Sequence, residues 1–454
     1  MPRKTKPEHI YMYDFKAFLH YNYLAWFKAK GQHYRLTPKR IFALVVFLLI
    51  YIPTEIIVWI CFGLDEILFP AYHQQQVKSP IFIIGNPRSG TTFTHRLIEK
   101  DCSTFTAATS WELIFCPSII QRKIIWAIRD MLQLLKVPFN KTMNEINENI
   151  SFNKSAHKIK LNGSEEDEHW LIHIWSTATL YPFYPIKEPT LNHYHFDQAF
   201  PREDRLRIMG FYKRMVQKHL FAHGGDKIFL SKNPSFTAKI ETLQEIFPDA
   251  KFVTLVRNPF DCMPSMMNYM ASGWKLFGSP LEPYPYKEEF FDVMRHLYLY
   301  PAEYFQDKSD ECMFIKYDEL VRHPDEVIID MYDWLDLPMS YRFSELLRRE
   351  THQQKNFQSK HQYDLAKMGL SEERIFREYE EVFQYYEFET HEFELPERKA
   401  WQGRGWQQNW KARRILRRER RLQRRLNRRI HRRARKGQPT TAGTAQPTHD
   451  PQRF

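Results

Sequence analysis

The sequence predicts a three-layer α/β fold in which a central parallel sheet lies between layers of helices. Short apolar runs bounded by Pro or Gly alternate with segments of helical periodicity. Two of these runs, residues 227–230 and 251–256, flank a helical segment at 237–247. A strand–helix–strand unit of this kind joins parallel strands. With 454 residues, 43% of them hydrophobic, the chain can form one large domain with appendages.

The other core elements are predicted in chain order from the same patterns. Residues 79–85 form an apolar run typical of a buried strand, and residues 92–100 have helical spacing. Residues 313–317 predict a further strand, and residues 324–335 a helix after it. We expect a main domain over residues 78–395, preceded by a polar segment at 1–40 and a membrane anchor at 41–69.

The apolar segment 41–69 allows three arrangements. It begins too late, and lacks a small-residue cleavage site, for an ordinary signal peptide. Residues 41–63 are long enough for one spanning helix. Pro53 removes a backbone donor and Glu55 is costly at mid-bilayer, so the sequence favours a kinked, re-entrant or in-plane anchor split at Pro53. A buried helical hairpin of the main domain is the third arrangement.

A glycine loop joins the strand at 79–85 to the helix after it. Residues 85–92 read GNPRSGTT, with the G-x-x-x-x-G spacing of a P-loop. Glycines let successive backbone N–H groups turn inward and hold a phosphate at the helix N-terminus. A nucleoside triphosphatase needs Lys after the second Gly, where this chain has Thr91. The loop therefore predicts a P-loop-like fold that grips a phosphate, with Arg88 as its cation.

Basic residues also follow two other predicted strands. Arg257 begins the string RNPFDCMPS, in which Ser265 lies eight residues further on and Asp261 is expected to cap the next helix. Lys232 lies in SKNP, directly after the strand at 227–230. Arg is a bidentate partner for phosphate. Taken alone, Arg257 is also consistent with a surface ion pair, and Lys232 with a solvated side chain.

The string PRSGTT, together with RNPFD and its Ser, resembles the two signatures of sulfotransferases that depend on 3′-phosphoadenosine-5′-phosphosulfate (PAPS), in particular the larger bacterial-type group. The resemblance covers about residues 78–340. It implies sulfuryl transfer from PAPS as co-substrate, without a metal, to a hydroxyl or amine of a lipid-like or carbohydrate acceptor.

The resemblance also implies roles for individual residues. Arg257 and Ser265 would bind the 3′-phosphate, and Tyr317 would lie beside the adenine. Phe93 stands where many members place an adenine-stacking Trp, although its helical spacing suits a core position equally. Lys232 would stabilise charge on the sulfuryl oxygens, and Asn233 departs from the usual K-[ST]-P pattern. The 5′-phosphate would be held by Arg88, Ser89, Gly90, Thr91 and Thr92, with Arg88 near the bridging oxygen.

An acidic cluster in GSEEDEHW, residues 163–170, provides candidates for the base that deprotonates the acceptor: Glu166, Glu168 and His169. Clustered carboxylates raise one another's pKa. Related sequences have a similar cluster in the acceptor half. A solvated acidic turn at a helix start is the alternative. The aromatic-rich residues 170–184 either line the acceptor site or belong to the core.

The net charge of +12 belongs to the C-terminal tail, residues 400–454. Residues 411–436 contain fifteen Lys or Arg and one acid, Glu419, so the rest of the chain is close to neutral. The tail predicts a basic helix, followed by a disordered end; the helix either binds anionic lipid, binds nucleic acid or is simply a solvated charged helix. This leaves two rival functions: a membrane-tethered nucleotide- or RNA-binding protein, and a P-loop kinase-like enzyme, which Thr91 disfavours.

Cysteines, histidines and sequons bear on metals and location. Five scattered cysteines contain no C-x-x-C, and His193 with His195 suggests no third ligand, so neither a disulfide framework nor a metal site is expected. Nine Lys or Arg before the apolar segment and sequons at Asn140, Asn149, Asn153 and Asn162 suit a lumenal Golgi enzyme. Pro53, Glu55 and the cysteines favour a membrane-associated chain that faces the cytoplasm.

Overall fold

The computed structural model describes residues 13–135, 161–354 and 364–395. The chain divides into two units, residues 1–399 and residues 400–454, and the described residues belong to the first. Three of the four sequons (Asn140, Asn149 and Asn153) and the whole basic tail lie outside the described residues. The five cysteines are all described and free.

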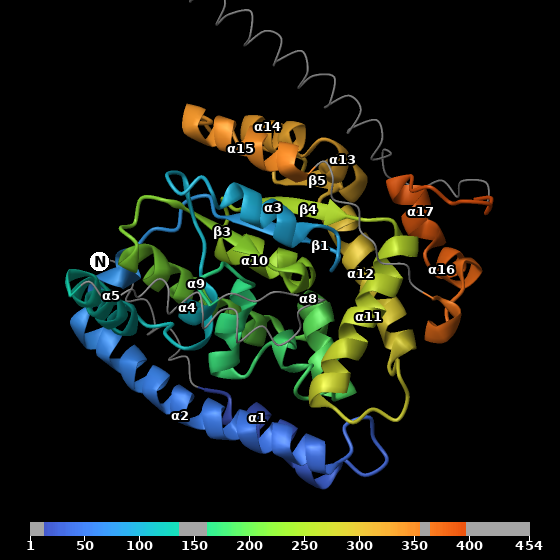
Figure 1. The fold of residues 1–454 in the computed structure, drawn as a ribbon, viewed down its shortest axis with the longest axis horizontal. Helices are drawn as coiled ribbons and strands as arrows, with labels where there is room; N and C mark the ends of the chain where they lie inside the picture. Colours follow the sequence, from blue (N-terminus) through green and yellow to red (C-terminus); the bar gives the residue numbers. More distant parts are fainter. Residues whose placement is uncertain (1–12, 136–160, 355–363, 396–454) are drawn as a thin grey trace, which may run out of the picture. The chain divides into compact units, whose positions relative to one another are not determined.

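The centre of the unit is a five-stranded parallel sheet, as the sequence predicts. Its order is β2-β3-β1-β4-β5, and every neighbouring pair is parallel (Figure 1). The strand β1 lies between β3 and β4, so the predicted strand–helix–strand unit crosses over it. The strands are β1 Ile81–Gly85, β2 Phe105–Thr106, β3 Ile228–Lys232, β4 Lys251–Val256 and β5 Cys312–Lys316.

Helices cover both faces of the sheet. The alternating residues of β1 explain the layers: Ile81 and Ile83 join one apolar core, while Phe82 and Ile84 join the other. The α-helices are α1 Phe15–Phe27, α2 Pro38–Leu68, α3 Thr91–Ile98, α4 Ser110–Ile114, α5 Ile119–Leu134, α7 Lys187–Thr190, α8 Phe196–Ala199, α9 Arg202–Ala222, α10 Ile240–Ile246, α11 Pro259–Phe277, α12 Lys287–Tyr304, α13 Tyr317–Arg322, α14 Pro324–Trp334, α15 Tyr341–Gln354, α16 Glu372–Glu378 and α17 Glu380–Tyr386.

Short 3₁₀ helices connect several of these elements and shift one predicted boundary. The helix expected at 237–247 begins as a 3₁₀ helix, Pro234–Lys239, and becomes α-helical only at Ile240. The other 3₁₀ helices are Pro70–Gln74, Asp167–Ile174, Ala178–Leu180, Leu191–His195 and Ala366–Met368. The helix after β4 is capped by Asn258, whose side chain accepts from the Phe260 N–H, and not by the expected Asp261.

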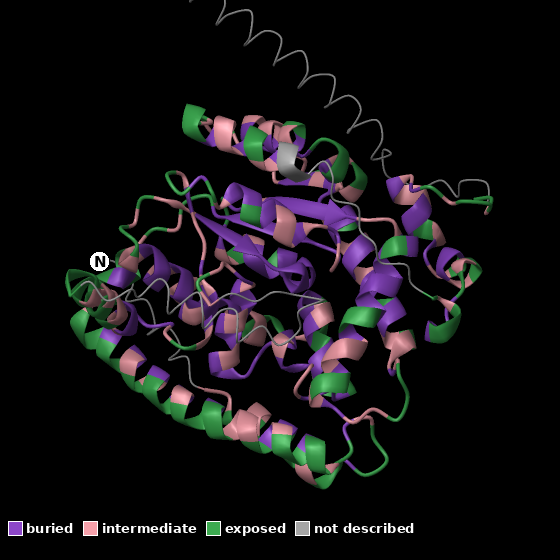
Figure 2. Cartoon of the chain, viewed as in Figure 1, coloured by how far each residue is buried: buried purple, intermediate pink, exposed green. Residues whose placement is uncertain are grey.

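The apolar segment forms one unbroken helix, α2, so the expected split at Pro53 is wrong. Pro53 is exposed inside the helix, and the neighbouring Thr54 hydroxyl donates to the carbonyl of Ile50. Glu55 does not face outward: it is buried and pairs with His173 Nδ1 at 2.7 Å. By length and composition α2 could cross a membrane, but one face of it packs along the domain (Figure 2).

The aromatic-rich residues 170–184 belong to the core, which decides between the two roles expected for them. Trp170 and Tyr181 lie in the main core, and Trp175 and Tyr184 lie in a third cluster together with residues of α1 and α2. Trp175 packs edge-on against Tyr51 of α2, at 5.1 Å between ring centroids. This segment therefore joins the N-terminal helices to the domain.

Candidate active site

The candidate site lies along the edge of the sheet where the parallel strands end. Gly85, Lys232, Val256 and Lys316 are the last residues of four of the strands. The register pairs Gly85 with Leu255 and Val256 with Lys316, so these ends meet at one edge. In open parallel sheets, ligands bind beside the carboxyl ends of the strands. The sheet therefore brings together three motifs that are far apart in the chain.

The phosphate loop depends on two glycines in the left-handed region of φ. Gly85 has a φ of 123°, and a Cβ there would overlap the carbonyl oxygen of Leu255 in the neighbouring strand. Gly90 has a φ of 93°, and a Cβ there would lie 3.1 Å from the Tyr317 ring. Arg88 has a φ of 70°, which few non-glycine residues adopt. The loop is thus a tight turn into the N-terminus of α3.

Arg88, Ser265, Arg257 and Tyr317 form one connected group. The Arg88 Nε donates to the Ser265 hydroxyl at 3.0 Å. The Arg257 guanidinium donates to the Arg88 backbone carbonyl at 3.3 Å and lies 4.3 Å from the centre of the Tyr317 ring. The structure therefore gathers the cations, the hydroxyl and the aromatic ring that the sequence predicts to hold a nucleotide with two phosphate groups.

Unpartnered polar atoms at this edge fit a bound anion. The Arg257 Nε and both polar side-chain atoms of Asn86, at the start of the loop, are buried and have no hydrogen-bond partner among the described residues. Such groups are costly unless a ligand or water satisfies them. The Arg257 Nε and the Asn86 Nδ2 are therefore donors that a phosphate or sulfate group would satisfy, whereas the Asn86 Oδ1 is an acceptor that needs a donor such as water.

The remaining loop residues have mixed environments. Ser89 is fully buried, and its hydroxyl donates to the Asn86 carbonyl at 2.6 Å, while Thr91 is buried at the start of α3. Thr92 is half-buried. Phe93 packs against the core on one face of the sheet, which favours the core alternative for this residue.

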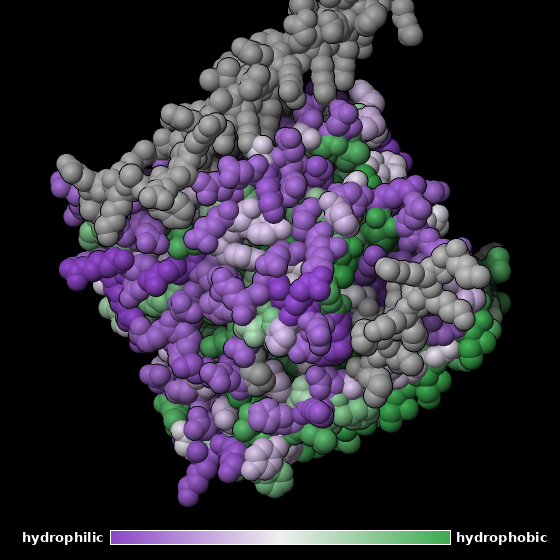
Figure 3. Space-filling model, turned by 180° about the vertical axis from the view of Figure 1, so that it is seen from behind, coloured by the Kyte–Doolittle hydropathy of each residue, from purple (hydrophilic) through white to green (hydrophobic). Residues whose placement is uncertain are grey.

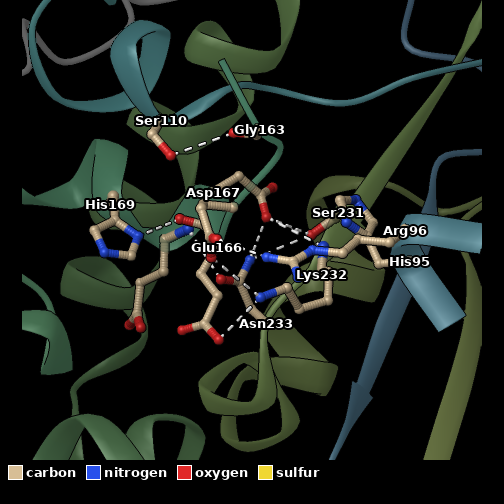
Figure 4. Close-up of polar contacts among 12 residues, drawn as sticks. His95, Arg96, Ser110, Gly163, Glu166, Asp167, His169, Ser231, Lys232 and Asn233 are labelled. Carbon is tan, nitrogen blue, oxygen red and sulfur yellow. Dashed lines mark hydrogen bonds and ion pairs between the residues drawn. The ribbon is translucent and has the colours of Figure 1, made fainter. Parts of the chain in front are cut away.

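Lys232 lies at the end of β3 and faces the acidic cluster. Its side chain is fully buried, and its ammonium group lies 3.1 Å from Glu166 Oε1 and 3.8 Å from Glu165 Oε2 (Figure 4). Arg96 of α3 lies 3.4 Å from the other oxygen of Glu165. Two cations and two carboxylates thus alternate beside the phosphate loop.

Asp167 holds this arrangement together. Its carboxylate accepts from Ser231 at 2.9 Å, from the Lys232 backbone N–H at 3.3 Å, and from Tyr212 and Asn233. Burial raises the pKa of Asp167 to about 6, although hydrogen bonds from Tyr212, Ser231 and Asn233 lower it. Asn233 also accepts from the Glu168 N–H at 3.1 Å, so its amide bridges β3 and the acidic cluster.

The three candidate bases differ in their surroundings. Glu166 is half-buried beside Lys232. Glu168 is buried, and its oxygens bind Lys239 at 2.9 Å and Ser235. Burial raises the pKa of Glu168, but Lys239 and Ser235 outweigh it and lower the pKa overall. His169 Nδ1 bonds the Glu166 carbonyl, and its ring points away from Lys232 in Figure 4. Geometry therefore places Glu166 alone of the three against the catalytic candidate Lys232.

The sequence-based prediction missed three residues of this site. Glu165 and Asp167 belong to the acidic cluster in residues 163–170, but the spacing of this cluster does not show which carboxylate contacts Lys232. Tyr269 of α11 lies with its ring centre 6.0 Å from the Arg88 guanidinium, and it has no motif of its own. Only its position, one helical turn after Ser265 in the same predicted helix, indicates from the sequence that Tyr269 lies near the site.

A second group of possible ligand atoms occurs in α4 and α9. Atoms of Glu112, His219 and His223 lie within 4.8 Å of one another, with the two histidines one turn apart. The buried Arg122 guanidinium reaches both Glu112, at 3.9 Å, and His219, at 3.4 Å. A cation therefore already occupies this cluster and opposes a divalent metal.

Comparison with known proteins agrees with the fold and the motifs. A model of the sulfotransferase family matches residues 80–341, more than half of the chain. The omega-hydroxy-beta-dihydromenaquinone-9 sulfotransferase Stf3 of Mycobacterium bovis is 24% identical over 289 residues, 61% of this chain and 68% of that protein. The protein of the same name from Mycobacterium tuberculosis matches to the same extent.

Two crystal structures share the fold. Sulfotransferase STF1 of Mycobacterium tuberculosis superposes with a TM-score of 0.58 at 18% identity, covering 81% of this chain and 93% of its own. Sulfotransferase STF9 of Mycobacterium avium gives 0.57 at 19% identity, covering 74% and 83%. The family match over residues 80–341 includes the phosphate loop, β3, β4 and β5, and the chain belongs to the sulfotransferase family.

Proposed function

We propose that this sulfotransferase transfers the sulfuryl group of PAPS to a hydroxyl of a lipid-like acceptor. The observation that carries the proposal is the group of Arg88, Ser265, Arg257 and Tyr317, with unpartnered Arg257 Nε, at the edge where Lys232 meets Glu166. PAPS supplies an activated sulfuryl group on the 5′-phosphate and carries a separate 3′-phosphate. The structure offers cations for both phosphates.

Different residues bind the donor, stabilise the developing charge and accept the proton of the acceptor. The backbone of loop residues 88–92 and the side chain of Arg88 hold the 5′-phosphate. Arg257 and Ser265 hold the 3′-phosphate. Lys232 stabilises the negative charge that develops on the oxygens of the transferring group. The new bond joins the acceptor oxygen to sulfur, the bond between sulfur and the bridging phosphate oxygen breaks, and the acceptor proton goes to Glu166. The products are a sulfate ester and 3′,5′-adenosine bisphosphate.

The acceptor class rests on two supports. The relative named above carries in its name a hydroxylated menaquinone, which is a lipid-like hydroxyl compound. This chain also presents a long apolar helix, α2, whose N-terminal end is bound to the helix that carries Ser265: the Arg40 side chain donates to the Phe277 carbonyl at the end of α11 at 2.7 Å. An acceptor embedded in a membrane would therefore lie close to α2, the helix through which the enzyme would contact that membrane.

The test is calorimetric binding of 3′,5′-adenosine bisphosphate to the full chain. We expect binding by the unmodified protein, loss of about tenfold or more with Arg257→Ala, and no change with Arg348→Ala, an exposed arginine on α15. No binding by a folded unmodified chain overturns the nucleotide assignment. Equal loss in both variants overturns the role of Arg257.

A further inference from the structure

One face of α2 is apolar and uncovered over most of its length. Every exposed residue from Ile41 to Ile60 is apolar, and Figure 3 shows the corresponding hydrophobic band along one edge of the molecule. Among the described residues no charged side chain interrupts this stretch. The exposed residues are Ile41, Phe42, Val45, Leu49, Ile50, Ile52, Pro53, Ile56, Ile57 and Ile60. We call this set the α2 apolar face.

The opposite face of α2 carries charges that are tied to the domain. Near the N-terminal end Arg40 binds the Phe277 carbonyl, in the middle Glu55 pairs with His173, and near the C-terminal end Asp65 pairs with Lys218 at 2.9 Å. Asp65 also accepts from the backbone N–H groups of Ile119 and Ile120 at the start of α5. The helix is therefore attached along its whole length.

These attachments argue against a spanning helix. To cross a bilayer, α2 would have to leave the domain, which would place Glu55 in hydrocarbon and leave His173 and Lys218 buried without partners. At 31 residues the helix is about 46 Å long, well beyond a hydrocarbon core of about 30 Å. A helix lying in the membrane plane keeps every pair.

The charges around the α2 apolar face fit anionic lipid. Residues 15–54 contain six Lys or Arg and no acid. Five of these cations are exposed and lie in or between α1 and the first turn of α2: Lys16, Lys28, Lys30, Arg35 and Lys39. The helix α1, which packs beside α2 through Tyr13 and Phe18, adds an exposed apolar row of Phe15, Leu19, Tyr23 and Phe27. Apolar residues rimmed by cations are typical of a surface that binds one leaflet.

We propose that the α2 apolar face docks the enzyme on one leaflet of a bilayer that contains anionic lipid, with α2 in the membrane plane and both of its ends on the side of the catalytic domain. The occupant of this face is the lipid surface itself. The proposal rests on the contacts of α2 and not on the nucleotide site, so the two can fail separately.

The first experiment measures flotation of the full chain with vesicles. Binding to mixed phosphatidylcholine and phosphatidylglycerol vesicles should exceed binding to phosphatidylcholine alone and should weaken as salt rises. Leu49→Glu and Ile56→Glu place a charge in the α2 apolar face and should each reduce binding by about tenfold or more. Val321→Glu, at an exposed apolar residue of α13, is the matched control and should bind normally.

Leu49 and Ile56 are both exposed, so we expect their variants to fold. Thermal unfolding of each variant checks that folded proteins are being compared. Equal vesicle binding by all three variants, or no binding by the unmodified chain, overturns the proposal. Nucleotide binding should be unchanged in every variant, which separates a failure of docking from a failure of the proposed reaction.

The second experiment distinguishes an in-plane helix from a spanning one. Arg35→Cys and Ala71→Cys place exposed cysteines before and after α2. In sealed, uniformly oriented membrane vesicles from expressing cells, an impermeant maleimide should label both cysteines or neither, measured against the unmodified protein. Labelling of one without detergent, and of the other only after detergent, would show a spanning helix and overturn the proposal.

Discussion

At the scale of single residues, the pair Lys232 and Glu166 carries the chemistry proposed for the site. Lys232 ends β3 and Glu166 directly precedes the 3₁₀ helix Asp167–Ile174, with 3.1 Å between the ammonium nitrogen and the carboxylate oxygen. Each has a neighbour of the same type that is committed elsewhere, since Lys239 and Glu168 pair with each other. Glu168 therefore serves as a control for the role assigned to Glu166.

Replacing Lys232 with Met should remove stabilisation of the transferring group and little of the nucleotide affinity. We expect kcat to fall by about 10²–10³, while the Kd for 3′,5′-adenosine bisphosphate changes little. Steady-state kinetics and calorimetry on the same preparation measure both. Lys251→Met is the matched control, because Lys251 begins β4 at the opposite edge of the sheet. A parallel loss of affinity and kcat would show that Lys232 binds the nucleotide instead.

The two glutamates should separate by pH profile. Glu166→Gln should lower kcat by about 10²–10³ and remove the acidic limb of the kcat/KM profile, because that limb reports the base. Glu168→Gln should keep the limb and lower the melting temperature, because it leaves Lys239 buried without its partner. If Glu168→Gln removes the limb and Glu166→Gln does not, the assignment of the base is reversed.

Asp167 should make stability depend on pH in an unusual direction. Its folded-state pKa, about 6, lies above its ordinary value of 3.8, so folding favours the protonated form. This contribution to stability is present below about pH 4 and is lost as the pH rises through about 6. Relative to Asp167→Asn, the unfolding free energy of the unmodified chain should fall by about 2 kcal/mol between pH 4 and pH 7. Urea unfolding at several pH values tests this, and a constant difference would contradict it.

At the scale of elements, α2 acts as part of the core as well as an apolar surface. Its buried side contributes to the cluster that contains Trp175 and Tyr184, while Asp65 accepts from the Ile119 N–H at the start of α5 and pairs with Lys218. An anchor joined only by a linker would have none of these contacts.

Breaking one of the attachments of α2 should therefore destabilise the whole domain. Asp65→Asn leaves Lys218 buried beside a neutral amide, and we expect a loss of about 3 kcal/mol in unfolding free energy. Asp307→Asn is the control: it makes the same chemical change at an exposed aspartate outside α2 and should cost less than about 1 kcal/mol. Denaturant unfolding in detergent measures both, and similar costs would show that the buried pair adds nothing to stability.

At the scale of the whole molecule, the N-terminal helices and the catalytic core form one unit. Deletion of residues 1–69 should expose the third cluster, which contains Trp175 and Tyr184, and should leave Lys218 without its partner Asp65. The shortened chain should therefore neither unfold cooperatively nor bind nucleotide, even in detergent. Deletion of residues 400–454, a separate unit, is the control and should preserve both. Near-ultraviolet circular dichroism and calorimetry measure the outcome. A folded, nucleotide-binding protein lacking residues 1–69 would show that α1 and α2 are a dispensable anchor.

The sequence by itself determined the parallel sheet, four of the five strands, the phosphate loop and the cations at the strand ends. These features are local: an apolar run, two glycines and the residue after a strand are readable from neighbours in the chain. The strand β2, with only two residues, was too short to leave such a pattern.

Only the tertiary structure decided which polar groups meet. From the sequence, Glu55 is costly in a membrane, because its partner His173 lies 118 positions further on and cannot be identified. Glu168 cannot be distinguished from Glu166 in the sequence, whereas the structure pairs Glu168 with Lys239. Pro53 did not break α2: the helix continues through this residue, and buried residues on its other side, such as Val58 and Phe62, pack into the core of the domain. A charge, a helix break or a catalytic base is defined by what surrounds it, and for these residues the surroundings come from distant parts of the chain.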